Sequence, residues 1–220
     1  MNTVKENFLE IKKDIAPYTP NIIAVTKYYD ESRIIEAYEA GLMDFGESKV
    51  IEAVEKIQRL PKEIRENSRF HLIGHLQTNK VKKAIGNFDY IQSVDSIKLA
   101  EKISEEALEI NIKQKVLLQI NNANEEQKFG FSKDEIRDAF PLILKMKGLE
   151  VAGLMNMAPY GLGHLELIEL FSDIVKLRDN LEKEFDCKLK EISMGMSGDY
   201  KEAVEAGATM VRIGRKLFSK

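Results

Sequence analysis

Short apolar runs alternate along the chain with longer stretches in which apolar residues recur at helical spacing. Runs of four or five mainly apolar residues, separated by amphipathic helical patterns, are typical of parallel strands joined by helices. We identify eight such runs, at residues 22–26, 43–46, 70–74, 90–94, 116–120, 151–155, 189–193 and 210–214. The pattern therefore predicts eight strand–helix repeats.

The stretches between the predicted strands carry boundary signals of helices. A first helix is expected over residues 2–16, where apolar residues recur every three or four positions ahead of two prolines. Ser132 and Glu135 have the spacing of a capping box, and Asp95 is expected to cap the helix after the fourth strand. Gly207 stands where a helix C-cap belongs.

The repeats favour a single α/β domain over residues 1–220, folded as a closed TIM-type (β/α)8 barrel instead of an open doubly wound sheet. No G-x-G-x-x-G string follows a strand, so the sequence gives no sign of a dinucleotide site. After the eighth strand only RKLFSK remains, which is too short for a full final helix. We therefore expect helix 2–16 to close the outer ring.

Composition narrows the range of partners. The chain has 33 Lys and Arg against 36 Asp and Glu, a formal net charge of -3, so no overall positive field favours nucleic acid or an anionic membrane. The opening MNTVKENFLEIKK is too charged for a signal peptide or a membrane span. Cys187 is the single cysteine, which favours a reducing cytoplasm. His71 and His75 fall on either side of a strand end, and no metal site is expected.

Chemistry in such a barrel is expected at the C-terminal ends of the strands. Lys27 follows the first strand, where it can reach solvent, pair with a carboxylate such as Glu47, or act as an amine. Imine formation requires the neutral amine, which burial or a neighbouring cation would favour by lowering the pKa. Position alone leaves these alternatives open.

The loops after strands seven and eight are the usual phosphate site of this fold. Ser197 and Gly198 open the helix after strand seven, and Gly214 and Arg215 follow strand eight. Their hydroxyl and backbone amides are suited to an anion, and Lys27 is expected across the same mouth. A phosphorylated aldehyde would satisfy both the anion site and the amine.

Several longer strings carry a family resemblance. They are IIAVTK, which ends in Lys27, FGESKV at 45–50, FHLIGHLQTNK at 70–80, KFGF at 128–131, GLMNMAP at 153–159, SMGMSGDY at 193–200 and MVRIG at 210–214. With these strings in order, the chain resembles the pyridoxal phosphate homeostasis proteins. The resemblance implies a barrel like the N-terminal domain of alanine racemase, which is the fold type III barrel of enzymes that use pyridoxal 5'-phosphate (PLP).

The resemblance also implies roles for named residues. It makes Lys27 the lysine that binds PLP as an imine, with Ser197 and the amides of Gly214 and Arg215 around the phosphate. It places Arg212 near the pyridine nitrogen, although an inward-pointing arginine can instead pair with Glu47.

Three further residues join the expected cofactor site, namely Ser48, Asn156 and Met194. Family members commonly have Asn at position 48 and often Thr at position 156. Ser48 lacks the amide of asparagine, so a contact made by that amide is missing in this chain, whereas Asn156 can still donate and accept hydrogen bonds.

The function implied is intracellular PLP homeostasis, in which the protein holds PLP and supplies it to apoenzymes. No catalytic residue is assigned and no fast enzymatic reaction is expected. One alternative is an amino-acid racemase or another slow PLP-dependent enzyme, but similar racemases add a C-terminal β-domain bearing a tyrosine base. Another is an interaction module in which PLP stabilises the fold or signals to a partner. We expect a cytoplasmic monomer that binds neither nucleic acid nor membrane.

Overall fold

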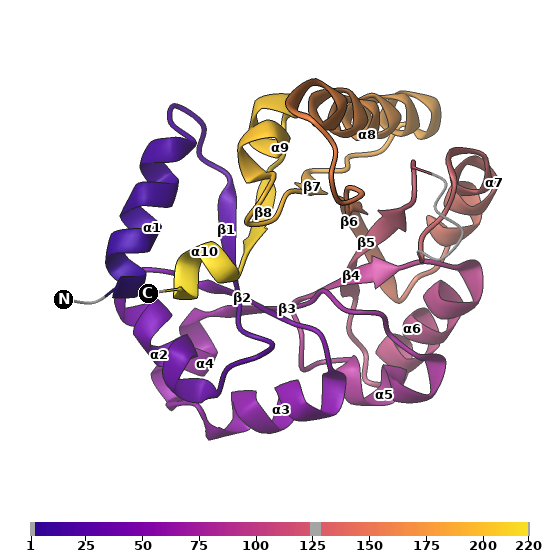
Figure 1. The fold of residues 1–220 in the computed structure, drawn as a ribbon. Helices are drawn as coiled ribbons and strands as arrows, with labels where there is room; N and C mark the ends of the chain where they lie inside the picture. The colour runs from indigo at the N-terminus through magenta and orange to yellow at the C-terminus, as the bar shows by residue number, and fades with distance from the viewer. Residues whose placement is uncertain (1–2, 124–128, 220) are drawn as a thin grey trace.

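Eight parallel strands close into one barrel within residues 3–123 and 129–219, which the computed structural model describes (Figure 1). Each strand pairs with its sequence neighbours, and β1 closes the ring by pairing with β8. The strands are β1 (Asn21–Val25), β2 (Asp44–Glu47), β3 (Arg69–Leu72), β4 (Tyr90–Val94), β5 (Gln114–Ile120), β6 (Leu149–Asn156), β7 (Glu191–Ser193) and β8 (Met210–Ile213). The predicted (β/α)8 barrel is confirmed.

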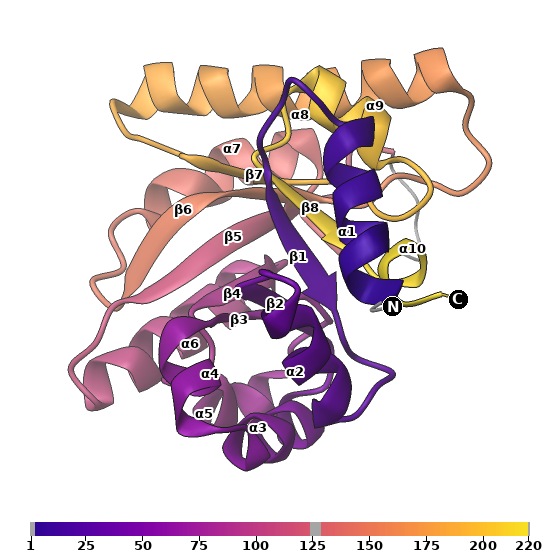
Figure 2. The same ribbon diagram turned by 90° about the vertical axis from the view of Figure 1, so that its left-hand side faces the viewer.

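Helices surround the barrel as an outer ring (Figures 1 and 2). They are α1 (Thr3–Asp14), α2 (Glu31–Glu39), α3 (Val50–Arg59), α4 (Lys62–Asn67), α5 (Val81–Ala84), α6 (Ile97–Glu109), α7 (Lys133–Ile143), α8 (His164–Phe185), α9 (Tyr200–Ala206) and α10 (Arg215–Phe218), with a 3-10 turn at Thr78–Lys80. The capping box of Ser132 and Glu135 is confirmed, as is Gly207 as a C-cap. Asp95 is not the cap predicted for α6, because Ser96 accepts the backbone N–H of Leu99 there.

The pleat of the strands divides their side chains between two apolar layers. Residues such as Ile22 and Ala24 point outward into the large core beneath the helices. Ile23, between them, points inward and belongs to a smaller apolar cluster in the barrel interior. Because successive strand residues face opposite sides, one step along a strand decides whether a side chain reaches the interior or the helix layer.

The N-terminal helix packs on the C-terminal end of the chain, where α1 and α10 lie side by side (Figure 2). Asn7 donates to the carbonyl oxygens of Leu217 and Ser219 at 3.0 and 2.9 Å. Lys216 pairs with Glu10 and Asp14 at 2.9 and 3.1 Å. The helix was expected over 2–16 and is found over Thr3–Asp14, while residues 1, 2 and 220 lie outside the described residues. That residues 1–220 fold as a single domain stays a prediction.

Within residues 3–123 and 129–219, no helix is both long enough and apolar enough to span a bilayer.

Candidate functional site

A cavity of about 980 Å³ opens at the C-terminal ends of the strands. This volume is at the upper end of the range for small-molecule sites in proteins. Six of the eight residues expected to bind cofactor line it: Lys27, Ser48, Ser197, Arg212, Gly214 and Arg215. The loops after β1, β2, β7 and β8 therefore bring together residues from opposite ends of the sequence.

Lys27 lies in the turn directly after β1 and is exposed at the cavity. Its ammonium nitrogen is 5.0 Å from the centre of the Tyr28 ring, a cation–π contact. The pairing with Glu47 that the sequence left open is not found, because Glu47 lies 2.7 Å from the amine of Lys56 on α3. Lys27 is thus an exposed lysine at the cavity, with its amine over the Tyr28 ring.

The segment before Lys27 is held by buried polar contacts. The Thr26 hydroxyl donates to Glu47 at 2.6 Å, and Lys56 donates to the carbonyl oxygen of Thr26 at 3.0 Å. The side chains of Lys56 and Glu47 are both nearly inaccessible to solvent. These contacts fix the end of β1, from which the Lys27 side chain extends.

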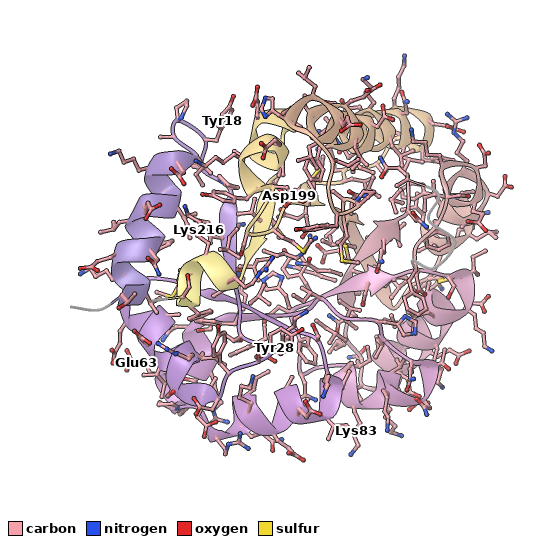
Figure 3. All side chains as sticks on the ribbon, in the orientation of Figure 1. Tyr18, Tyr28, Glu63, Lys83, Asp199 and Lys216 are labelled. Carbon is pink, nitrogen blue, oxygen red and sulfur yellow. The ribbon has the colours of Figure 1, made fainter. Side chains whose placement is uncertain are left out.

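The loops after β7 and β8 meet at Ser197, whose hydroxyl oxygen accepts the backbone N–H of Lys216 at 3.3 Å. Figure 3 labels Asp199 beside α9 and Lys216 on the neighbouring α10. Gly195 has a φ of +87°, and a Cβ there would lie 2.5 Å from the Cβ of Ala203. The tight turn at Gly195 therefore depends on glycine and sets the position of Ser197.

Arg212 projects inward from β8 and is only 3% exposed. It donates to the hydroxyl oxygen of Ser193 at 2.7 Å and to the carbonyl oxygen of Asn156 at 2.8 Å. Burial lowers the pKa of Arg212 to about 10, although the negative field of Asp199 opposes this shift. The guanidinium therefore stays protonated at neutral pH, and its predicted alternative partner, Glu47, pairs with Lys56 instead.

Asn156 and Met194 are not among the described residues that line the cavity, and their place in the cofactor site stays a prediction. The pleat explains both cases, because each follows an inward-facing residue, Met155 or Ser193, and so points outward. The amide of Asn156 donates to the carbonyl oxygen of Ile120 at 3.0 Å and to Asn122 at 2.9 Å. Met194 is fully buried in the core beneath the helices.

Gly74 and His75, at the end of the third predicted strand, also line the cavity, although no cofactor role was assigned to them from the sequence. The ring of His75 stacks on Phe129 with centroids 3.8 Å apart, and its Nδ1 lies 3.0 Å from a carboxylate oxygen of Asp95. Gly74 lies so close to Ser48 that a Cβ on Gly74 would be 2.4 Å from the Ser48 carbonyl oxygen. The string FHLIGH contained both positions, but only tertiary packing relates them to Asp95 and Ser48. Lys128 of the KFGF string lies outside the described residues.

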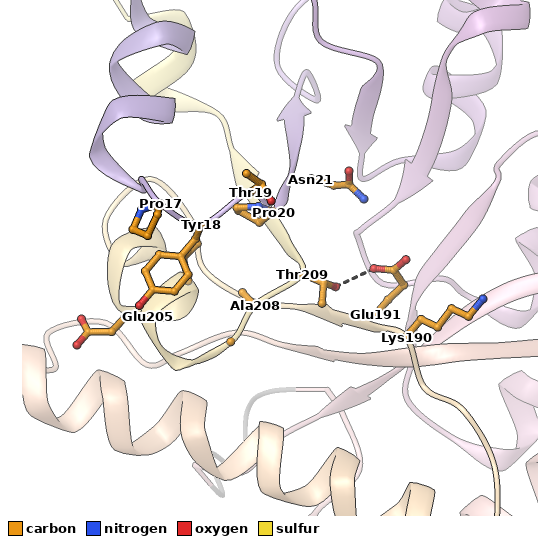
Figure 4. Close-up of a pocket in the computed structure, with 12 residues that line it drawn as sticks. Pro17, Tyr18, Thr19, Pro20, Asn21, Lys190, Glu191, Glu205, Ala208 and Thr209 are labelled. Carbon is orange, nitrogen blue, oxygen red and sulfur yellow. Dashed lines mark hydrogen bonds between the residues drawn. The ribbon is translucent and has the colours of Figure 1, made fainter.

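A second hollow, of about 570 Å³, lies near the N-terminal ends of β1, β7 and β8 (Figure 4). Thr209 donates there to Glu191 at 2.7 Å. This hollow contains none of the residues expected to bind cofactor. Because the N-terminal face of such barrels generally serves stability, the cavity at the opposite face is the candidate functional site.

Comparisons with known proteins agree with the fold and the sequence strings. Residues 1–219 match the family model described as "Alanine racemase, N-terminal domain". The pyridoxal phosphate homeostasis protein of Synechocystis sp. is 39% identical over 202 residues, which cover 92% of this chain and 92% of that protein. The human protein of the same name is 35% identical, over 94% of this chain and 79% of its own length.

Solved structures extend the comparison. PipY of Synechococcus elongatus with PLP bound has a TM-score of 0.88 and 34% identity, covering 98% of this chain and all of that one. Alanine racemase of Clostridium difficile has a TM-score of 0.83 at 15% identity, covering all of this chain and 57% of the racemase. The second likeness shows a shared barrel fold.

Proposed function

Because the chain belongs to the alanine racemase N-terminal domain family, we propose that it binds PLP in the cavity at the barrel mouth, as an imine of Lys27, and serves PLP homeostasis. Support comes from relatives named pyridoxal phosphate homeostasis protein and from PipY, whose structure contains PLP. Under this proposal the chain holds the cofactor and hands it to apoenzymes.

The cavity fits the cofactor in size and in chemistry. Its volume of about 980 Å³ is ample for one small phosphorylated ring. A primary amine at Lys27 and the Ser197 loop line the same space, so one ligand can reach both. The observation that carries the proposal is this shared cavity, which is lined together by an amine, a hydroxyl and two glycine-containing loops.

The residues then have distinct roles. Lys27 supplies the amine, and Ser197 with the amides of Gly214 and Arg215 binds the phosphate. Arg212 presents a protonated guanidinium to the ring nitrogen. The cofactor itself supplies an aldehyde carbon for the imine and a ring that withdraws electrons from it.

The decisive measurement is an absorption spectrum of the purified protein before and after borohydride, followed by mass analysis of the modified peptide. We expect a yellow protein and a reduced pyridoxyl group on the peptide that contains Lys27. A colourless protein that takes up no added PLP would contradict the proposal.

Several parts of the biological role are also proposals. We propose a cytoplasmic monomer whose partners are PLP and PLP-dependent apoenzymes, without nucleic-acid or membrane binding. Ser48 lines the cavity and is available for a weaker polar contact than the asparagine common in the family. Asn156 supplies a backbone carbonyl to Arg212 and so acts on the ligand indirectly.

Replacing Ser197 with alanine is expected to weaken PLP binding by about one to two decades. A hydrogen bond to a charged phosphate oxygen contributes about 1.5–3 kcal/mol, and this substitution removes one. The measurement is a fluorescence or absorbance titration of each protein with PLP. Ser96→Ala, which removes a helix cap away from the cavity, should leave the affinity unchanged. Equal affinities of Ser197→Ala and the unmodified protein would remove Ser197 from the site.

A racemase is the second candidate function, favoured by the shared fold, but Tyr200 does not supply the second catalytic group that it needs. Racemisation needs an acid and a base on opposite faces of the substrate α-carbon. Tyr200, the tyrosine of most interest in the sequence, is buried outside the cavity and donates to Asp14. Burial and this bond raise the pKa of Tyr200 to about 12, so the phenol stays protonated at neutral pH and cannot take up a proton as a base.

We therefore expect amino-acid turnover far below about one per second. Arg212 reinforces this expectation, because a protonated arginine beside the pyridine nitrogen leaves that nitrogen unprotonated. An unprotonated ring withdraws electrons from a carbanion less strongly than a ring that is protonated beside a carboxylate. The test incubates the PLP-loaded protein with single L-amino acids in deuterium oxide and follows α-proton exchange and the D-enantiomer. In parallel, transfer of PLP to an apoenzyme is measured. Racemisation at one per second or faster would favour the enzyme instead of the carrier.

A further inference from the structure

A chain of side-chain hydrogen bonds crosses the barrel interior beneath the cavity. Arg212 donates to Ser193 at 2.7 Å, and the Ser193 hydroxyl donates to Oε1 of Gln92 at 2.7 Å. Nε2 of Gln92 lies 2.9 Å from Nδ1 of His71, and Nε2 of His71 lies 2.9 Å from Asp44. We call these five residues the interior chain. It links β8, β7, β4, β3 and β2.

The far end of the interior chain fixes the direction of its bonds. Burial alone would raise the pKa of Asp44, but hydrogen bonds from His71 and Arg69 hold it below the usual value, so the group is a carboxylate. A carboxylate only accepts, hence His71 donates from Nε2. In the neutral imidazole Nδ1 then accepts from the Gln92 amide, and Oε1 of Gln92 accepts from Ser193. Each hydrogen bond therefore has one assigned donor: Arg212 donates to Ser193, Ser193 to Gln92, Gln92 to His71, and His71 to Asp44.

The interior chain places polar side chains where their burial costs free energy of folding. All five residues are buried, among inward-facing apolar residues such as Ile23 and Leu117. Buried polar groups destabilise a protein unless they are all hydrogen-bonded, and an apolar interior would avoid the requirement. The ring of His71 is further held by stacking on Tyr90, with centroids 4.9 Å apart and planes 5° apart. A fully bonded polar chain of this kind holds its end group in one orientation.

We propose that Gln92 and His71 are positioning residues for Arg212, and that they set how its guanidinium meets the ring nitrogen of bound PLP. This inference rests on the proposed function, and it assigns a role to residues that do not line the cavity. Ser193 Oγ accepts from Arg212 and donates its own proton to Gln92, and the Gln92 amide donates to His71 at 2.9 Å and makes a longer contact with the Met210 sulfur at 3.8 Å. The orientation of Arg212 thus depends on strands across the barrel.

The test compares two buried glutamines. Gln92→Leu breaks the interior chain, whereas Gln114→Leu removes the buried bond of Gln114 to the Phe88 carbonyl, which has no part in it. We expect Gln92→Leu to weaken PLP binding by about tenfold or more and to shift the absorption maximum of the bound cofactor and its pH dependence. Gln114→Leu should lower thermal stability yet leave affinity and spectrum near those of the unmodified protein.

Three further variants keep the proposal testable if the Gln92→Leu protein does not fold. Ser193→Ala removes a single hydroxyl and should give the same spectral shift to a smaller extent. His71→Gln keeps one donor and one acceptor, so it should retain affinity and spectrum better than His71→Leu. In the unmodified protein without PLP, nitrogen NMR should show neutral His71 protonated at Nε2, and adding PLP should move this signal.

The outcomes separate the two proposals. Unchanged affinity and spectrum in Gln92→Leu and Ser193→Ala, with normal PLP uptake by the unmodified protein, would overturn the positioning role and leave the proposed function intact. Equal losses in Gln92→Leu and Gln114→Leu would also overturn it, because they would indicate general destabilisation. If the unmodified protein takes up no PLP, the proposed function fails and this inference fails with it.

Discussion

Lys27→Ala is expected to abolish the borohydride-reducible pyridoxyl adduct. Among residues 3–123 and 129–219, Lys27 is the one lysine that lines the cavity, and an imine requires the amine nitrogen itself at the aldehyde carbon. The remaining contacts at the Ser197 loop should still bind PLP, but reversibly and more weakly. The measurement is quantitative mass analysis of reduced adduct on each peptide, together with dialysis of the unreduced protein.

The matched control is Lys49→Ala, which removes an exposed lysine that pairs with Glu52 near the same mouth. It should keep the full adduct on the Lys27 peptide. An adduct on Lys27→Ala of the same size as in the unmodified protein would show that Lys27 is not the attachment residue.

Lys56→Met is expected to destabilise the fold by about 3–5 kcal/mol, because it leaves the buried carboxylate of Glu47 without its ion-pair partner at 2.7 Å. It also removes the bond from Lys56 to the Thr26 carbonyl. For a domain of this size the loss corresponds to a fall of roughly 10 °C in the melting temperature. Thermal and urea unfolding, followed by circular dichroism, measure it.

Two controls identify the cause. Lys62→Met breaks an exposed pair with Glu66 and should cost less than about 1 kcal/mol. The double variant Glu47→Gln, Lys56→Met removes the unpaired charge and should recover part of the stability lost in Lys56→Met. If the double variant is less stable than Lys56→Met alone, the unpaired charge is not the source of the loss.

The alternation of strands and helices was sufficient to predict the barrel, because buried parallel strands and amphipathic helices each have a strong local signal. Strand bounds differ by at most two residues: β4 is found at Tyr90–Val94 as expected, and β1 at Asn21–Val25 where 22–26 was expected. The cap of α6 was misassigned to Asp95 because two adjacent residues, Asp95 and Ser96, can both cap. Only the structure shows that the Asp95 side chain contacts His75, while Ser96 caps the helix.

The sequence indicates which side chains reach the cavity less precisely than it indicates the fold, for a physical reason. Motif position indicates which loop a residue occupies, but a pleated strand sends neighbours to opposite faces. Met194 and Asn156 therefore lie beside the site in sequence yet point into the helix layer or toward Asn122. Lys56 gave no signal at all, since a lysine on an amphipathic helix normally faces solvent, and its burial depends on Glu47 from β2.

Closure of the barrel by β1 and β8 has a consequence for the newly made chain. After the ribosome has released β1, one edge of this strand can pair with β2. The other edge stays unpaired until β8 has been synthesised. The apolar face of α1 likewise stays uncovered until α10 has been synthesised. An open strand edge and an uncovered apolar face are the usual starting points of misassembly. The loops after β1, β7 and β8 also meet only at this last stage, so a cofactor that needs all of them can be captured only after translation of the barrel is complete.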